Sequence, residues 1–408
     1  MTPDSRFLDR RSPPHIMTLV LLAGLPALSL NIFLPSLPAM ASHFGVSYST
    51  MQLSLSLYLV ATAVLQILVG PISDMMGRRP VMLATTAIFI LATFGALVAP
   101  NYGVFLVCRL LQATMTAGLV LSRAVVRDIV SQDQAASMIG YVTMGMSIVP
   151  MVGPVIGGAL EEAWSWHGSF VLLLLGGLGL FALIWADMGE TAQRAGSGFA
   201  EQVRQYPELL KARRFWGYCL SAASAAGAFY AYLGGAPYVG SEVFGMDPAT
   251  LGLWFGAPAV GYMAGNYLSG RFAMRLGVNR MVLIGTLFTT AGLLALTLLT
   301  LAGFTAPAVF FGSIVTVGLG NGVVLPSANA GMLSVRPRLA GSASGLGGAF
   351  MIGGGAALSV LAGAVLGPGS GALPLVLLML ASSVMSVVFI LWVLARERSL
   401  RRSGGLPG

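Results

Sequence analysis

The sequence predicts an all-α membrane protein with twelve transmembrane helices, arranged as two six-helix pseudo-repeats. Of its 408 residues, 56% are apolar and only 9% are charged, whereas a soluble protein of this length carries about 25% charged residues. Twelve helices of about 20 residues need roughly 240 apolar positions, and the apolar residues together with 53 glycines supply them. This composition excludes an ordinary soluble enzyme.

The transmembrane helices are expected where long apolar runs are bounded by turn residues and charges. In the first half these runs cover residues 16–38, 51–71, 80–99, 104–126, 135–160 and 168–187. In the second half they cover residues 214–239, 249–270, 281–301, 306–329, 340–366 and 373–395. We therefore expect an N-terminal half at 1–188, a linker at 189–213 and a C-terminal half at 214–408. Apolar residues at helical spacing from Phe199 to Leu210 predict an amphipathic helix within the linker, lying on the membrane surface.

The charges indicate the orientation of these helices rather than a charged ligand. Lys and Arg fall in alternate connections and in both tails, whereas connections 41–50, 161–167 and 240–248 contain none. By the positive-inside rule, both termini and the linker are expected in the cytoplasm, in a multi-pass protein of the inner membrane. The formal net charge of +8 is therefore assigned to topology, and no nucleic-acid partner is expected.

The two halves resemble each other at a constant offset along the chain. Residues 70–77 stand opposite 270–277, with glycine at both ends of each segment, and Met151–Pro154 stands opposite Met351–Gly354. Repeated six-helix units are typical of alternating-access transporters. The sequence contains no Gly-rich ATP-binding loop and no cluster of His, Asp or Glu within the spans. We therefore expect neither an enzyme nor a bound metal or cofactor.

A conspicuous pattern of glycine and charge joins the second and third spans. Gly70 is expected to let a neighbouring helix approach closely, and Gly77 to permit a tight turn. Asp74 lies at a membrane boundary, where a carboxylate is costly unless it is paired, and Arg78 and Arg79 follow within one helical turn. The pattern resembles the G-x-x-x-D-x-x-G-R-[RK] signature of the major facilitator superfamily.

This resemblance implies a conformational latch. In the superfamily the aspartate and the first arginine of the signature form a network with an acid at the end of span 4. In this sequence Asp128 stands at that position. The latch would hold the outward-facing state of the transporter.

Span 4 contains Arg109 and Gln112, which resemble the R-x-x-Q motif of the same superfamily. An arginine well inside a span costs about 2.5–3.5 kcal/mol on insertion scales, so it is expected to face a wet cavity or a partner. The alternative is that Arg109 lies close enough to the outer surface for its side chain to snorkel there.

Span 5 carries small residues and prolines that resemble the motif of antiporters within the superfamily. Small residues four apart allow close helix packing, which is also the alternative explanation without any antiporter role. The motif residues are Gly145, Pro150, Gly153, Pro154 and Gly157. Together with Leu34–Pro38 and Leu121–Asp128, they make the chain resemble the bicyclomycin/chloramphenicol-resistance branch of the drug:proton antiporters.

One departure from this branch concerns the coupling mechanism. Relatives usually carry an aspartate in span 1, where this sequence has Asn31, and asparagine cannot titrate. All fourteen acids are assigned to tails, loops or helix ends, so the resemblance, and not these residues, implies proton antiport. We expect a carboxylate placed at position 31 to lie beside Arg109.

We therefore expect a secondary active transporter that exports small, mostly apolar drug-like molecules by alternating access. The family resemblance makes protons the coupling ion, and the bilayer is the other partner. Tyr58 and Tyr232 are candidate pocket residues, because aromatic side chains with a few polar groups suit apolar ligands. Two alternatives stay open: a transporter of a metabolite such as a nucleoside or sugar, and a receptor or scaffold, which should tolerate Arg109→Ala.

Overall fold

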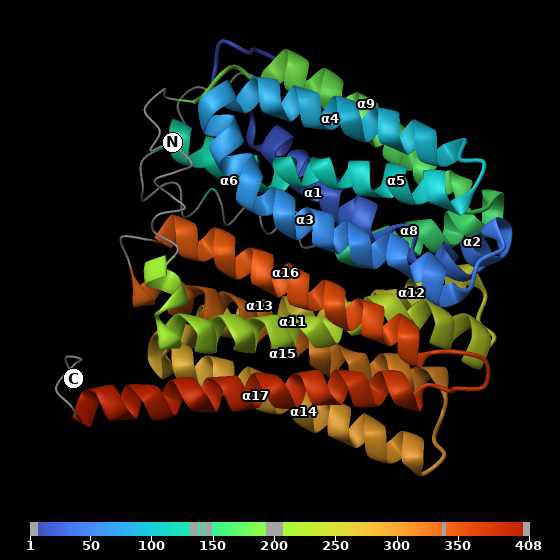
Figure 1. The fold of residues 1–408 in the computed structure, drawn as a ribbon, viewed down its shortest axis with the longest axis vertical. Coiled ribbons are helices and arrows are strands. Elements are labelled where there is room, and N and C mark those ends of the chain that lie inside the picture. The colour runs from blue at the N-terminus through green and yellow to red at the C-terminus, as the bar shows by residue number, and fades with distance from the viewer. Residues whose placement is uncertain are drawn as a thin grey trace. The chain divides into compact units, whose positions relative to one another are not determined.

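The computed structural model describes residues 7–130, 138, 142, 149–192, 207–336 and 340–402, which are almost entirely helical and contain no strand. These residues divide into two compact units (Figure 1). The first contains the helices from α1 to α9 together with α12, and the second contains α11 and the helices from α13 to α17. Since α12 belongs to the first unit, the helices do not divide at a single point of the chain.

The first unit begins with α1, which ends at Asn31, before the end of the first apolar run, and is followed by a short 3₁₀ turn, η1, and then α2. Its elements are α1 (Ile16–Asn31), η1 (Leu34–Ser36), α2 (Leu37–Phe44), α3 (Tyr48–Met76), α4 (Arg78–Leu97), α5 (Tyr102–Gln112), η2 (Ala113–Met115), α6 (Thr116–Ile129), α8 (Val149–Trp164), α9 (His167–Asp187) and α12 (Pro248–Phe255). Pro35 lies within η1 and removes a backbone donor there, which accounts for the break in α-helical geometry.

The second unit is built mostly from long helices. Its elements are α11 (Arg213–Tyr238), the π-helical η3 (Val239–Val243), α13 (Ala257–Leu276), α14 (Val278–Leu301), α15 (Pro307–Val335), α16 (Ala340–Val365) and α17 (Leu373–Arg402). At one end Glu397 of α17 accepts hydrogen bonds from Arg214 of α11 and Asn279 of α14, each at 2.5 Å. This carboxylate joins three helices.

The predicted all-α fold is confirmed. Within the described residues, nine helical stretches are long and apolar enough to cross a membrane. The three other predicted spans correspond to α8, whose predicted beginning lies outside the described residues, to α11, and to α12 with α13, which are separated at Gly256. The predicted amphipathic segment lies mostly outside the described residues, although 207–210 form a helical turn.

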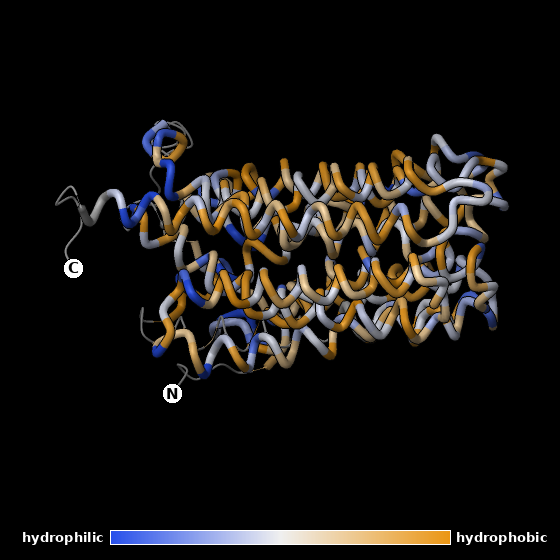
Figure 2. The backbone as a smooth tube through the Cα atoms, turned by 90° about the horizontal axis from the view of Figure 1, so that it is seen from below, coloured by the Kyte–Doolittle hydropathy of each residue, from blue (hydrophilic) through white to orange (hydrophobic). Residues whose placement is uncertain are grey.

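Hydropathy along the backbone follows the pattern that a membrane requires. Figure 2 shows apolar residues along the lengths of the helices and the most hydrophilic residues at helix ends, in each unit mainly near the terminus that it carries. A hydrocarbon interior cannot solvate charges or free backbone groups, so helices satisfy their own backbone and carry their charges at the ends.

The glycines of α8 allow two close helix contacts within the first unit. Gly153 faces Asn31 of α1, and a Cβ atom at Gly157 would overlap the carbonyl oxygen of Ile32. On the neighbouring face of α8, a Cβ atom at Gly158 would overlap the carbonyl oxygen of Pro248 in α12. The predicted close packing through small residues is confirmed for this part of span 5.

Two residues of the predicted antiporter motif are not fully described by the structure. Gly145 lies outside the described residues, and Pro150 lies in α8 with its side chain not described. Pro154 instead takes part through its backbone, since a Cβ atom at Gly252 of α12 would overlap the Pro154 carbonyl oxygen.

We predict that Gly157→Ala destabilises the protein, because the added methyl group has no space against the Ile32 carbonyl. Such overpacking costs about 1–3 kcal/mol, which would lower the melting temperature in detergent. Gly179→Ala on α9 is the control: no heavy atom of the described part of the chain lies within 4 Å of its added methyl, and alanine favours a helix over glycine by about 0.5–1 kcal/mol. An unchanged melting temperature for Gly157→Ala would contradict the close α1–α8 contact.

Candidate functional site

Arg109 of α5 lies in the interior of the first unit with 0% of its surface exposed. Its Nη1 donates to Gln112 Oε1 at 2.5 Å, and more distant hydrogen bonds of 3.4 Å reach the hydroxyl and the carbonyl oxygen of Ser29 on α1. The snorkelling alternative is therefore wrong, because the side chain is enclosed by protein rather than extended to the surface.

Three aromatic rings surround the guanidinium of Arg109. Its Cζ lies 4.3 Å from the ring centroid of Phe33, 4.6 Å from that of Tyr58 and 6.0 Å from that of Phe170. Each aromatic face attracts a cation, by about 2 kcal/mol or more where water is excluded. The rings come from the α1–η1 connection, α3 and α9, so three parts of the first unit meet at this charge.

The positive charge of Arg109 has no counter-ion in the described part of the chain. None of the four ion pairs found there includes Arg109, and its Nε has no hydrogen-bond partner. Burying a charge costs several kcal/mol even after partial compensation. Arg109 is therefore held by neutral groups alone, and an anion or a dipolar ligand would be favoured there.

Gln112 holds the guanidinium in one orientation through a chain of hydrogen bonds. Its Nε2 donates to Thr93 Oγ1 on α4 at 2.8 Å, and the Thr93 hydroxyl donates to the Phe89 carbonyl oxygen at 2.6 Å. The amide is thereby fixed with its oxygen toward Arg109. The spacing of the R-x-x-Q pair allows this, because residues three apart lie on the same face of a helix.

Asn31 does not face Arg109. Its Nδ2 donates to the Ala27 carbonyl oxygen at 2.7 Å and its Cβ lies toward Gly153 of α8, while its Oδ1 has no hydrogen-bond partner among the described residues. The expectation that a carboxylate at position 31 would lie beside Arg109 is wrong. The contact to Arg109 comes from Ser29, and residues two apart on a helix point in nearly opposite directions.

The two candidate tyrosines lie in different units. Tyr58 is 2% exposed and donates a long hydrogen bond of 3.5 Å to the Pro26 carbonyl oxygen. Tyr232 is buried on α11 of the second unit, with its ring 6.3 Å from those of Phe229 and Phe311. Only Tyr58 therefore belongs to the Arg109 cluster of the first unit.

The loop between α3 and α4 carries the predicted charge network. Arg78 Nη1 lies 2.5 Å from Asp74 Oδ1, and its Nε lies 3.1 Å from Asp128 Oδ2 on α6. Arg78 also donates a short hydrogen bond to the Ser73 hydroxyl. The predicted grouping of Asp74, Arg78 and Asp128 is thus present in the structure.

Glu190 holds the beginning of α4, and sequence reasoning missed it. Its carboxylate accepts hydrogen bonds from the backbone N–H groups of Arg78 at 2.8 Å and Arg79 at 3.3 Å. Backbone N–H groups in the first turn of a helix have no acceptor within the helix, so Glu190 supplies one. The helix dipole also favours a negative charge at this end. The acid lies shortly after the end of α9, close to a helix terminus, which is the sequence signal that could have identified it.

Gly77 makes the predicted turn before α4, whereas Arg79 contacts α9 rather than Asp74. Gly77 has a φ of 97°, as the predicted tight turn requires, and a Cβ atom there would overlap the Glu190 carboxylate. Arg79 does not pair with Asp74. Its Nη2 instead donates to the Trp185 carbonyl oxygen at 3.2 Å, and its guanidinium lies 5.1 Å from the centroid of the Trp185 ring.

The close helix approach predicted at Gly70 is not found. No heavy atom of the described residues lies within 4 Å of a Cβ atom built at this position. Its backbone contributes instead, because the Gly70 carbonyl oxygen accepts a 2.7 Å hydrogen bond from Ser73, the residue that Arg78 contacts.

Comparisons with known proteins identify the family. The model of the Major Facilitator Superfamily matches residues 19–360 and 241–408, which together span almost the whole chain. The chain belongs to the Major Facilitator Superfamily. It is a multi-pass membrane transporter of that family.

Two relatives confirm the narrower resemblance. The chain is 34% identical over 296 residues to a chloramphenicol resistance protein of Pseudomonas aeruginosa, covering 69% of each. It is 28% identical over 392 residues to a bicyclomycin resistance protein homolog of Haemophilus influenzae, covering 95% of the chain and 97% of that relative. A crystal structure of a D-xylose-proton symporter superposes with a TM-score of 0.72 at 14% identity, covering 93% of the chain and 96% of the symporter, which supports the fold alone.

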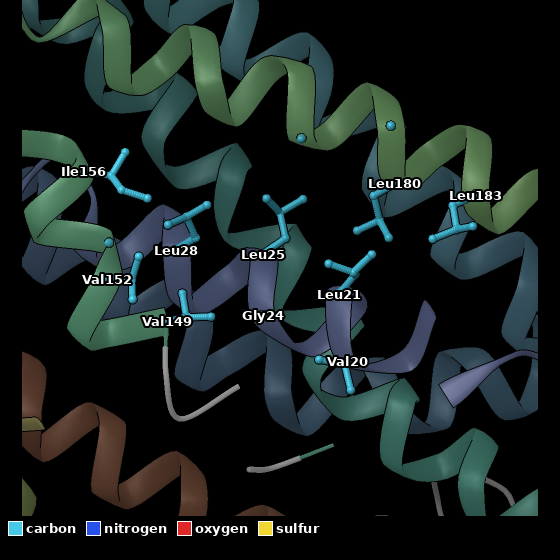
Figure 3. Close-up of a pocket in the computed structure, with 13 residues that line it drawn as sticks. Val20, Leu21, Gly24, Leu25, Leu28, Val149, Val152, Ile156, Leu180 and Leu183 are labelled. Carbon is cyan, nitrogen blue, oxygen red and sulfur yellow. The ribbon is translucent and has the colours of Figure 1, made fainter. Parts of the chain in front are cut away.

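An apolar cavity of about 560 Å³ lies between α1, α8 and α9 of this transporter. Figure 3 shows its lining, in which Leu25 and Leu28 of α1 project between Ile156 of α8 and Leu180 of α9. The described lining residues are all aliphatic or glycine. The cavity lies on the α8 side of α1, the side that Asn31 faces, and its chemistry suits a saturated hydrocarbon group.

Two further acids have buried oxygens, and one of them lies outside its predicted connection. Asp187, at the end of α9, is completely buried and accepts hydrogen bonds from Leu8 N, His15 N and the Thr18 hydroxyl at 2.6–2.9 Å. Glu161 was expected in the connection 161–167, but α8 continues to Trp164, so Glu161 lies in the last turn of the helix with Oε2 buried. The absence of basic residues from 161–167 indicated the side of the membrane and not where the helix ends.

We predict that Glu190→Gln lowers the stability of the transporter by about 1 kcal/mol, because it removes the negative charge at the N-terminus of α4. Thermal unfolding in detergent measures this. Glu162→Gln makes the same chemical change at an exposed position of α8 and is expected to leave the melting temperature unchanged. Equal stability of the two variants would contradict the capping role of Glu190.

Proposed function

We propose that this transporter exports small, mostly apolar drug-like molecules by alternating access between two six-helix halves, residues 1–188 and 214–408. The names of the chloramphenicol and bicyclomycin resistance relatives support this class of substrate. The alternation of Lys- and Arg-containing connections supports placing both termini and the linker 189–213 in the cytoplasm, with the chain in the inner membrane.

The observation that carries this proposal is the buried charge of Arg109, enclosed by aromatic rings and without a counter-ion in the described residues. A drug-like molecule with an apolar ring and an acceptor oxygen would stack against the aromatic side chains and hydrogen-bond the guanidinium. We assign Arg109, Gln112 and Tyr58 to this contact. Asn31, on the α8 side of α1 in the first unit, and Tyr232, in the second unit, are proposed to contact substrate separately from Arg109.

The charge network at the α3–α4 loop is proposed to act as the latch of one conformational state. Its ion pairs are partly exposed, with 12–26% of the side chains accessible, so they can break and re-form without leaving a charge buried in hydrocarbon. The proposed latch residues are Gly70, Asp74, Gly77, Arg78, Arg79 and Asp128.

The close contacts of α8 support a role for the antiporter motif in the conformational change. On one face of α8, Gly153 and Gly157 pack closely against the end of α1, and on the other face Pro154 packs against α12. Contacts this close cannot change by small steps, so a movement of α8 would keep or break each of them entirely. Gly145 and Pro150 belong to the same proposed motif. Proton coupling is proposed from the family, since Asn31 cannot carry the proton.

Growth of an overexpressing strain against a panel of antibiotics, including chloramphenicol and bicyclomycin, tests the proposal. We predict resistance for the wild type and its loss in Arg109→Ala, because the variant removes the charge to which the ligand binds. Arg271→Ala, which changes an exposed arginine of the second unit, is the control and is expected to keep resistance.

Two outcomes would favour the alternatives. A wild type that changes sensitivity to no antibiotic but transports a nucleoside or sugar would be a metabolite transporter. A protein whose cellular phenotype is unaffected by Arg109→Ala would fit a receptor or scaffold.

We also predict that Asp74→Ala impairs transport while membrane insertion and expression persist. Removing the 2.5 Å partner of Arg78 would shift the balance of conformational states and not the fold. Glu208→Ala is the control, because it breaks the more exposed 2.9 Å pair with Arg336. Transport at the wild-type rate by Asp74→Ala would exclude the latch.

A further inference from the structure

One face of α8 meets the end of α1 along a seam that ends at a carboxyl group. Gly153, Gly157 and Glu161 are spaced four residues apart, so they lie on the same side of the helix. Gly153 lies against Asn31 and Gly157 against Ile32, and the Glu161 carboxyl lies beside the Ser36 hydroxyl of η1. The seam therefore continues from α1 to η1, past the point where the α-helix ends.

Three buried polar atoms of this α1–α8 seam have no hydrogen-bond partner in the described part of the protein. They are Asn31 Oδ1, Ser36 Oγ and Glu161 Oε2. An unpartnered buried polar atom costs about 1–3 kcal/mol, and Glu161 is half-buried, so ionising it here is less favourable than in water. No lysine or arginine of α1, η1, α8 or α12 is available to neutralise Glu161.

Protonation of Glu161 would change the hydrogen bonds that its carboxyl group can form. An ionised carboxylate only accepts hydrogen bonds, whereas a protonated carboxyl also supplies one donor. The Ser36 hydroxyl beside it can accept that hydrogen bond and can equally donate one to the ionised carboxylate, so the preference for the protonated form comes from the partial burial of Glu161 away from water. The closed seam therefore favours the protonated acid, and an open, hydrated seam favours the carboxylate.

We propose that Glu161 is a proton-binding group of this transporter, protonated while α8 is closed against α1 and ionised when the seam opens. The proposal rests on the proposed transport function and supplies the titrating group that Asn31 cannot. By linkage, a state that binds the proton more tightly is stabilised as the pH falls, so acid favours the closed seam. Opening would release the proton.

The titratable neighbours are consistent with this role. Glu162 on α8 is exposed, and Asp247 begins α12, where the hydrogen bond from the Thr250 backbone N–H lowers the pKa of its carboxyl. Both carboxylates are exposed to solvent, which screens their charges, so neither sets the protonation of Glu161. His43 of α2 and His167 of α9, with ring centroids 5.7 Å apart, are the titratable groups on the other elements nearby. Protonation of these histidines would add positive charge and favour the ionised form of Glu161.

Infrared spectroscopy of the purified protein, without any substrate, tests proton binding directly. We expect the wild type to show the C=O band of a protonated carboxylic acid at pH values where exposed acids are ionised. The band should be absent in Glu161→Gln and present in Glu162→Gln, the adjacent exposed control. Persistence of the band in Glu161→Gln, or its absence from the wild type, would overturn the proposal.

Chloramphenicol flux in proteoliposomes then tests coupling. A pH gradient of one unit is expected to change the steady-state ratio of chloramphenicol across the membrane about tenfold in the wild type and Glu162→Gln, the effect of a single coupled proton, and to leave that ratio unaffected in Glu161→Gln. An equal change in Glu161→Gln would exclude coupling through this acid. Failure of the wild type to exchange chloramphenicol without a gradient would count against the proposed drug transport instead, and the infrared result would still decide whether Glu161 binds a proton.

Discussion

A guanidinium in the interior of a membrane protein must be given partners by the protein itself, and in the first unit this constraint is met at Arg109. Ser29 and the Phe33 ring come from α1 and its continuation, Tyr58 from α3, and Phe170 from α9. All of these partners are neutral, so they reduce the cost of burial without removing the charge. These helices hold the Arg109 side chain in a fixed position while leaving its charge without a counter-ion among the described residues. A side chain that binds a ligand is expected to have this property.

The helix α1 separates this charge from the proposed proton site. Ser29 faces Arg109, whereas Asn31 and Ile32 face the glycines of α8. A movement of α1 that admits a ligand to Arg109 would also change the seam that encloses Glu161, because both contacts depend on the same few residues. Exclusion of charge from hydrocarbon explains the rest of the arrangement: the network around Arg78 lies at helix ends, where Glu190 also joins the end of α9 to the start of α4.

Much of the fold was predictable from the sequence, because apolar runs and charge alternation report directly on the solvent that each segment meets. The glycine turn at Gly77 and the pairing of Arg78 with Asp74 and Asp128 were also predictable, since they depend on local spacing and a family motif. The aromatic surroundings of Arg109 were not, because Phe33 and Phe170 are far apart in the chain and resemble any other apolar residues. Glu161 was misplaced because loop boundaries were assigned from charge, which does not determine where a helix ends.

The central claim is that the charge of Arg109 is retained for ligand binding at a cost to stability. Replacing it by methionine, a flexible apolar side chain, separates the two contributions. Melting temperature and ligand affinity should be measured together for the wild type and Arg109→Met, using an antibiotic to which the wild type confers resistance. An uncompensated charge predicts a variant at least as stable as the wild type that binds the antibiotic at least about tenfold more weakly, as expected when a charged hydrogen bond is lost. A destabilised variant with unchanged affinity would show that Arg109 is structural, and would contradict the claim.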